Sequence, residues 1–156
     1  MAITPIILAA GMPLTGYNAA QVSSLSTDSI VKMSTQQVVQ LSESAIGGLT
    51  SVQIRLITTT NLQAMTDTQV AALSSSQVSY LLSGQVAQLL TSQFQSISTS
   101  GVKGLTTSQI SNLGSPQVQA LKATQINALG AVQIKALSSA SVQSINTSEV
   151  QDIEVA

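Results

Sequence analysis

Apolar and polar residues along this chain repeat with a period of eight. Four successive segments, TTSQISNL, GSPQVQAL, KATQINAL and GAVQIKAL, cover residues 106–137 and show the pattern most clearly. A small polar residue or glycine usually comes first, glutamine fourth, a β-branched residue fifth and leucine eighth. The frame continues without insertion or deletion from Asn18 to Ile153, which makes 17 octads and 136 of the 156 residues. Positions 5 and 8 are apolar in every octad.

This period excludes one continuous helix or strand. Eight residues at ~100° each advance by ~800°, so positions 5 and 8 would drift by ~80° per octad around a long helix. In a continuous strand the two positions would point to opposite faces, because they differ by an odd number. The chain must therefore change direction in every octad.

Position 1 is Ser, Thr, Asn or Gly in 14 of 17 octads, and position 4 is Gln in 11. Ser/Thr-x-x-Gln is a capping box, in which the first hydroxyl and the fourth side chain each accept a backbone N–H of the other residue. The pattern predicts an N-cap at position 1, a short helix at positions 2–7, and a buried side at positions 5 and 8. Pro116 at position 3 fits the first turn of such a helix.

The few charged residues have the polarity of a helix dipole. Acidic residues stand at positions 2 to 4 and basic residues at positions 6 or 7, which favours the respective helix ends. Eight of the eleven charges obey this rule: Asp28, Glu43, Asp67, Glu149, Lys32, Arg55, Lys103 and Lys135.

Helices of this length cannot persist alone, because helix nucleation is costly. They must bury positions 5 and 8 against neighbouring octads, as in a solenoid. We therefore predict an all-α solenoid of very short helices built from 17 octads. Gln21, Gln37 and Gln53 recur every 16 residues, which indicates two octads per coil. A β-solenoid is the alternative, favoured by Val and Ile at position 5 and by the abundant Ser and Thr.

We divide the chain into an apolar N-terminal arm with a degenerate first coil (residues 1–17), the octad solenoid (18–153) and a C-terminal tail (154–156). The arm is uncharged and must cover its apolar surface. We expect it to dock on a neighbouring subunit, and folding back over its own first coil is the alternative. Leu82 and Leu90 are apolar residues at cap positions, in octads 9 and 10, and the aromatic residues Tyr80 and Phe94 lie near them in the sequence. This indicates extra burial, either inside the superhelix or under another subunit. The candidate assembly interface is Ile3, Ile6, Ile7, Leu8, Met12, Leu14, Tyr80, Leu82, Leu90 and Phe94.

Glycines outside position 1 allow two interpretations. Gly47 and Gly48 either mark close backbone approach or a bend in the superhelix, or they reflect sequence drift. Gly101 and Gly104 mark a second possible bend.

Composition argues against most kinds of chemistry. The chain has no Cys and no His, only 7% charged residues and a net charge of −1. We therefore expect no enzyme activity, no cofactor and no metal site, since Ser and Thr lack a base and the acids are dispersed. Five scattered basic residues make nucleic-acid binding unexpected, and no apolar run is long enough for a membrane span. A near-neutral surface favours self-association. The regular Gln and Thr side chains are a possible contact for a glycan.

The segment LTTSQISNLGSPQVQALKATQINAL (residues 105–129) resembles the LTxxQIxAL octapeptide repeats of large secreted bacterial proteins, notably in cyanobacteria and proteobacteria. There the repeats often accompany adhesin or calcium-binding toxin-like modules, which this sequence lacks. A repeat-only chain is similar to the subunits of tubular surface pili of cyanobacteria.

The resemblance and the composition together imply a non-enzymatic structural subunit. We expect it to form a homopolymeric extracellular filament or surface layer, and a monomeric glycan-binding or surface-binding module is the alternative. The N-terminus lacks the basic region of a signal peptide. The C-terminal residues DIEVA (152–156) resemble the end of type I secretion substrates.

Overall fold

The computed structural model describes residues 6–9, 11–139 and 143. In this part of the chain, fifteen short helices follow one another, and the only β-structure is a single bridge between Ile6 and Leu25. The helices are α1 (Ala19–Ser23), α2 (Thr27–Lys32), α3 (Thr35–Gln40), α4 (Glu43–Gly47), α5 (Ser51–Leu56), α6 (Thr59–Ala64), α7 (Asp67–Ala71), α8 (Ser75–Tyr80), α9 (Ser83–Ala87), α10 (Thr91–Ser96), α11 (Thr99–Lys103), α12 (Thr107–Ser111), α13 (Ser115–Gln119), α14 (Ala123–Ala128) and α15 (Ala131–Lys135). The all-α solenoid is thus confirmed over these residues, and the β-solenoid is wrong.

Each helix occupies positions 2–6 or 2–7 of its octad, as predicted. In α5, Gln53 N donates to Thr50 Oγ1 at 3.3 Å, and Thr50 N donates to Gln53 Oε1 at 2.9 Å. Where the side chain of the cap residue has no hydrogen-bond acceptor, only one of the two capping-box hydrogen bonds is made. Leu82 N, for example, still donates to Gln85 Oε1 at 2.7 Å. The glutamine therefore begins the helix even when the cap residue cannot.

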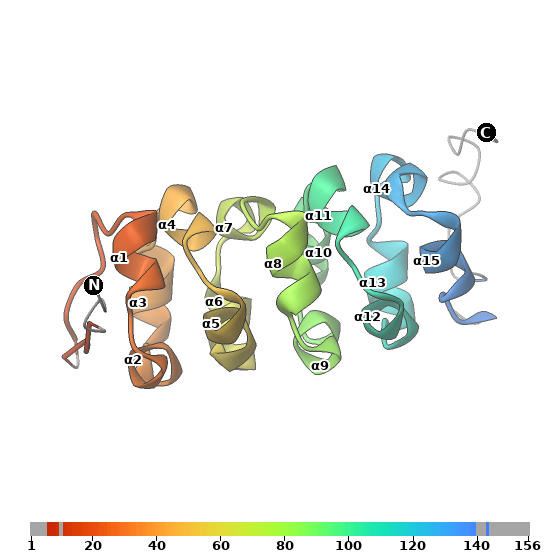
Figure 1. Ribbon diagram of the computed structural model, residues 1–156. Coiled ribbons are helices and arrows are strands. Elements are labelled where there is room, and N and C mark those ends of the chain that lie inside the picture. Colours follow the sequence, from red (N-terminus) through yellow and green to blue (C-terminus); the bar gives the residue numbers. More distant parts are fainter. Residues whose placement is uncertain (1–5, 10, 140–142, 144–156) are drawn as a thin grey trace.

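Successive helices wind around one central axis and form an elongated superhelix (Figure 1). The helices in extensive contact are three places apart, for example α1 with α4, α8 with α11 and α11 with α14. Side-chain hydrogen bonds join octads four places apart, as from Gln53 to Val22. One turn therefore contains between three and four octads, and the expected two octads per coil are wrong.

Positions 5 and 8 point toward the axis and form one continuous core. Position 5 is at most 5% exposed from Val22 to Ile126, and most residues at position 8 are equally buried. Position 4 is buried as well in most octads. In most described octads, three of the eight residues thus fill the centre of the superhelix.

Two glycines lie at close contacts between coils. A Cβ on Gly48 would stand 2.2 Å from Ala19 O, and a Cβ on Gly104 would stand 2.0 Å from Ser75 O. Both glycines are at position 7, and their octads carry a small residue, Ala45 or Gly101, at position 4. At these places α4 lies closely on α1 and α11 on α8, so close approach, not drift, explains Gly48. Gly47 has open space around its Cβ direction.

The described part of the N-terminal arm, residues 6–9 and 11–17, lies on the first coil of its own chain. Ile6 N donates to Ser24 O at 2.8 Å, and Ser26 N donates to Ile6 O at 2.9 Å. Leu14 is completely buried in the core. The arm turns at Gly11 and Gly16, whose φ angles of 77° and 83° favour glycine. Folding back, the alternative expectation, is thus the arrangement in this structure.

Candidate functional site

A ladder of buried glutamine amides runs along the superhelix. In octad 12, Gln109 Nε2 donates to Val78 O at 2.8 Å and to Leu81 O at 2.7 Å. These carbonyls belong to positions 5 and 8 of the octad four places earlier. The same pair of bonds is made by Gln53, Gln69, Gln77, Gln85, Gln93, Gln125 and Gln133.

Each ladder glutamine has two tasks. Its Oε1 closes its own helix, as when Thr106 N donates to Gln109 Oε1 at 2.7 Å, and its Nε2 joins the coil to the preceding one. A buried amide needs all its hydrogen bonds satisfied, and this arrangement satisfies them. The sequence pattern predicted the hydrogen bond that caps the helix. It did not predict the hydrogen bonds from Nε2, because the superhelical turn brings their acceptors close. Most ladder glutamines are therefore buried and not exposed as the expected glycan contact requires, and a contact through Thr side chains stays a prediction.

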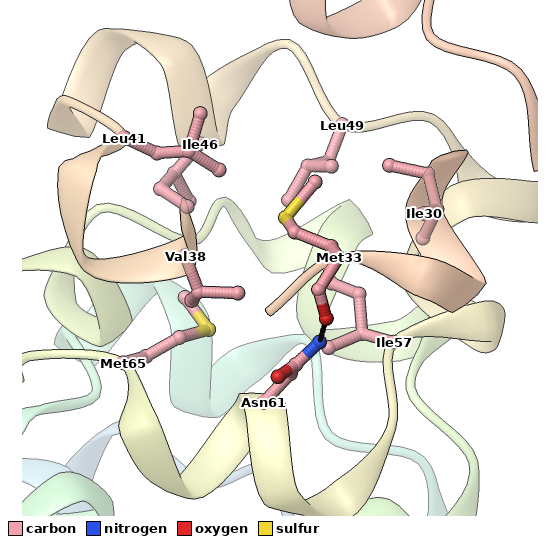
Figure 2. A pocket seen from close by; sticks show the side chains of 9 residues that line it. All are labelled: Ile30, Met33, Val38, Leu41, Ile46, Leu49, Ile57, Asn61 and Met65. Carbon is pink, nitrogen blue, oxygen red and sulfur yellow. Dashed lines mark hydrogen bonds between the residues drawn. The ribbon is translucent and has the colours of Figure 1, made fainter. Parts of the chain in front are cut away.

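The ladder is weakened at octad 6. Asn61 is one methylene shorter than Gln, and its Nδ2 reaches only Met33 O, at 2.7 Å. A cavity of about 10 Å³ lies beside it, lined by Ile30, Met33, Val38, Leu41, Ile46, Leu49, Ile57, Asn61 and Met65. Figure 2 shows these side chains around the cavity, with a dashed line for the hydrogen bond from Asn61 to Met33. The cavity is of about the smallest size for one water, and its apolar lining makes it a packing defect and not a binding site.

The residues of the expected assembly interface fall into three groups. Phe94 is completely buried inside the superhelix, and Tyr80 packs against the core. Leu14 is buried and Ile6 and Leu8 are half-buried, all against the chain's own first coil. Four residues are exposed: Ile7 (73%), Leu82 (51%), Leu90 (48%) and Met12 (43%). Ile3 lies outside the described residues.

The N-terminal arm takes the place of a preceding coil. Gln37 Nε2 donates to Met12 O at 2.8 Å, and Ser29 Oγ donates to Ile6 O at 3.2 Å. Both donors are at position 4, and the arm supplies backbone carbonyls as a fourth-previous octad does elsewhere. Gln21, also at position 4, is exposed, and its Nε2 has no acceptor among the described residues.

Helix α15 is the last helix among the described residues, and two further octads follow it in the sequence. It has no buried residue, and Ile134, at position 5, is 38% exposed.

A groove of about 520 Å³ is open on the surface between the loop before α4 and the loop before α7. Its lining includes the hydroxyl side chains of Ser42, Ser44, Thr66 and Thr68, and the carboxylate of Glu43. Thr66 and Thr68 hydroxyls lie 3.0 Å apart. The groove has hydrogen-bonding groups and no aromatic side chain.

Within the described residues, no three acidic, histidine or cysteine side chains gather as metal ligands. None of the helices there combines the length and apolar character that crossing a membrane needs. The one ion pair found in this part joins Lys32 Nζ and Asp28 Oδ1 at 2.9 Å, one turn apart on the surface of α2. Such a pair contributes only a few tenths of a kcal/mol.

A protein-family model described as the ALTTAQ repeat matches residues 86–123. The match includes the segment LTTSQ (residues 105–109), in which the capping box and the ladder glutamine of octad 12 are found. Neither the curated proteins nor the solved structures give a match. The chain is a repeat protein, an all-α solenoid of octads, and its residues 86–123 are similar to the ALTTAQ repeat.

Proposed function

We propose that this protein is a non-enzymatic structural subunit that self-assembles into an extracellular filament or surface layer. The observation that carries the proposal is the apolar surface at the N-caps of α9 and α10, where Leu82 is 51% and Leu90 is 48% exposed. The other octads carry a polar residue or glycine at this position. Leaving apolar side chains in water costs ~25 cal/mol per Å² of apolar surface, so a covering partner is favoured.

Another copy of the chain is a suitable partner, because every coil of the superhelix already packs on a coil of the same sequence pattern. Contact between different faces of identical subunits is heterologous, and it gives an open filament unless the rotation closes. The low charge supports this assembly, since eleven charged side chains provide little repulsion between copies. The similarity to secreted octad-repeat proteins supports a location at the cell surface.

The test is the assembly state of the full chain. Light scattering after size-exclusion chromatography and negative-stain electron microscopy, over a range of concentrations, should show elongated polymers of uniform width. Leu82→Asp together with Leu90→Asp should abolish them and keep the helical circular dichroism, because both residues are exposed N-caps, a position that Asp favours. The control Val132→Asp, on α15 and 69% exposed, should still assemble. A chain that stays monomeric at every concentration would contradict the proposal.

The groove between the loops before α4 and α7 favours a second function, binding of a glycan by a monomeric module. Hydroxyl groups of Ser42, Thr66 and Thr68 and the carboxylate of Glu43 offer donors and acceptors to a sugar. Calorimetric titration with neutral oligosaccharides should then give a binding heat that Thr68→Val removes. No heat with a monomeric chain would reject this second function.

A further inference from the structure

A filament of this chain needs two contact surfaces. A face that packs on the same face of a second copy makes an isologous contact, which is complete after two copies. The exposed Leu82 and Leu90 provide one such surface, at the N-caps of α9 and α10. We propose, on the basis of the proposed self-assembly, that the groove between the loops before α4 and α7 is the second surface and that it binds Lys103 of a second copy.

The groove has the chemical groups that a lysine side chain needs. Val39 lines it and is 47% exposed, so it offers apolar surface to the methylene stem of a lysine. The carboxylate of Glu43 and the hydroxyl groups of Ser42 and Thr68 are oxygen acceptors for the ammonium group. Glu43 is exposed and forms no ion pair within the described residues. A cationic side chain therefore complements this groove better than a neutral sugar does.

Lys103 has the matching properties. It lies in the last turn of α11, which packs on both α8 and α14, and it is exposed although these neighbouring helices cover α11 on two sides. No acidic side chain of the described residues forms an ion pair with Lys103. The sequence contains no acidic residue from position 68 to position 148. A second copy can supply the missing carboxylate, from Glu43 in its groove.

The groove and Lys103 lie on the same side of the superhelix. Helices three places apart are in contact and ladder bonds join octads four places apart, so seven octads make close to two turns. Helices α4 and α11 are seven octads apart, and both are followed by a glycine in the same close contact, Gly48 with Ala19 and Gly104 with Ser75. In Figure 1, α4, α7 and α11 lie along one edge and α9 lies along the opposite edge. The proposed surface is therefore distinct from the one at α9.

This placement suits two copies related by a two-fold axis. When the copies lie antiparallel with this side of each facing the other, the groove of the first meets Lys103 of the second, and the groove of the second meets Lys103 of the first. The two-fold axis makes both contacts equivalent, so one arrangement pairs both lysines. Contacts of this kind on one side and contacts through Leu82 and Leu90 on the other side then alternate along the filament.

Charge reversal tests the inference in the full chain, with light scattering after size-exclusion chromatography as the assay. Lys103→Glu should raise the concentration for half-maximal filament assembly at least about tenfold, because like charges then meet in the groove. Glu43→Lys should have the same effect. The double variant Glu43→Lys with Lys103→Glu should assemble like the unmodified chain, because each pair is restored with its charges exchanged. Lys135→Glu, at the same position of α15 and also exposed, is the matched control and should assemble normally.

The outcomes separate the two proposals. In Lys103→Glu, dimers joined through Leu82 and Leu90 should remain where the unmodified chain forms filaments. Filaments of Lys103→Glu at the same concentration as those of the unmodified chain would overturn the role of the groove and leave self-assembly standing. A double variant as impaired as the single variants would overturn the pairing of Glu43 with Lys103. If the unmodified chain and Lys135→Glu both remain folded monomers at every concentration, the proposed self-assembly itself is wrong.

Discussion

Replacement of one ladder glutamine by alanine measures how strongly the coils are joined. In Gln109→Ala three hydrogen bonds are lost: Thr106 N to Oε1 at 2.7 Å, Nε2 to Val78 O at 2.8 Å, and Nε2 to Leu81 O at 2.7 Å. Each such bond contributes about 1 kcal/mol net, so the free energy of unfolding should fall by about 3 kcal/mol. For a chain of this size that corresponds to a decrease in Tm of about 6–12 °C.

Two other glutamines provide a graded comparison. Gln117 makes one amide bond, to Ala87 O at 3.0 Å, and one cap bond, from Gly114 N at 3.1 Å, so Gln117→Ala should cost about 2 kcal/mol. Gln119 is exposed on the same helix, at position 6, and Gln119→Ala should change stability by less than about 0.5 kcal/mol.

The assay is urea unfolding followed by circular dichroism at 222 nm, at a protein concentration where each variant is monomeric. The expected order of loss is Gln109→Ala, then Gln117→Ala, then Gln119→Ala. Hydrogen exchange of the amides in α8 and α12 should increase in the first variant, because the lost bonds join these two helices. Equal midpoints for the position-4 and position-6 variants would refute the structural role of the ladder.

Four further substitutions follow from the packing between coils. Gly48→Ala should lower the stability in thermal unfolding by at least about 2 kcal/mol, because its Cβ would stand 2.2 Å from the backbone of Ala19. Gly47→Ala should raise the stability by up to about 1 kcal/mol, because its Cβ would meet open space and alanine favours a helix. Asn61→Gln should raise the urea midpoint by the equivalent of about 1 kcal/mol, since the longer side chain completes the ladder beside the small cavity, and an unchanged midpoint would refute this. Ile126→Asp should give a chain that is insoluble or has no cooperative melting transition, because an unpaired carboxylate would lie in the core. An unchanged melting curve would show that position 5 is not buried.

Much of this fold was predictable from the sequence because its causes are local. A capping box, a helix dipole and a pair of apolar positions three residues apart act within eight residues. The helix of every described octad, its first residue and its inward side follow from them. The exposed positions of Leu82 and Leu90 did not follow, because an apolar residue at a cap position can lie inside the superhelix or at its surface, and only the surrounding coils decide which.

The tertiary structure decided how the octads are arranged around the axis. The period of eight is compatible with any number of octads per turn, and the turn of between three and four is set by how side chains at positions 4, 5 and 8 fill a shared centre. That turn brings carbonyls 28 and 31 residues earlier to each ladder amide, as for Gln77 with Leu49 and Ile46, which no local pattern contains. The turn also brings Gly48 against Ala19 and places the arm on Ser29 and Gln37. These contacts join segments that are distant in the sequence, so no local pattern predicts them.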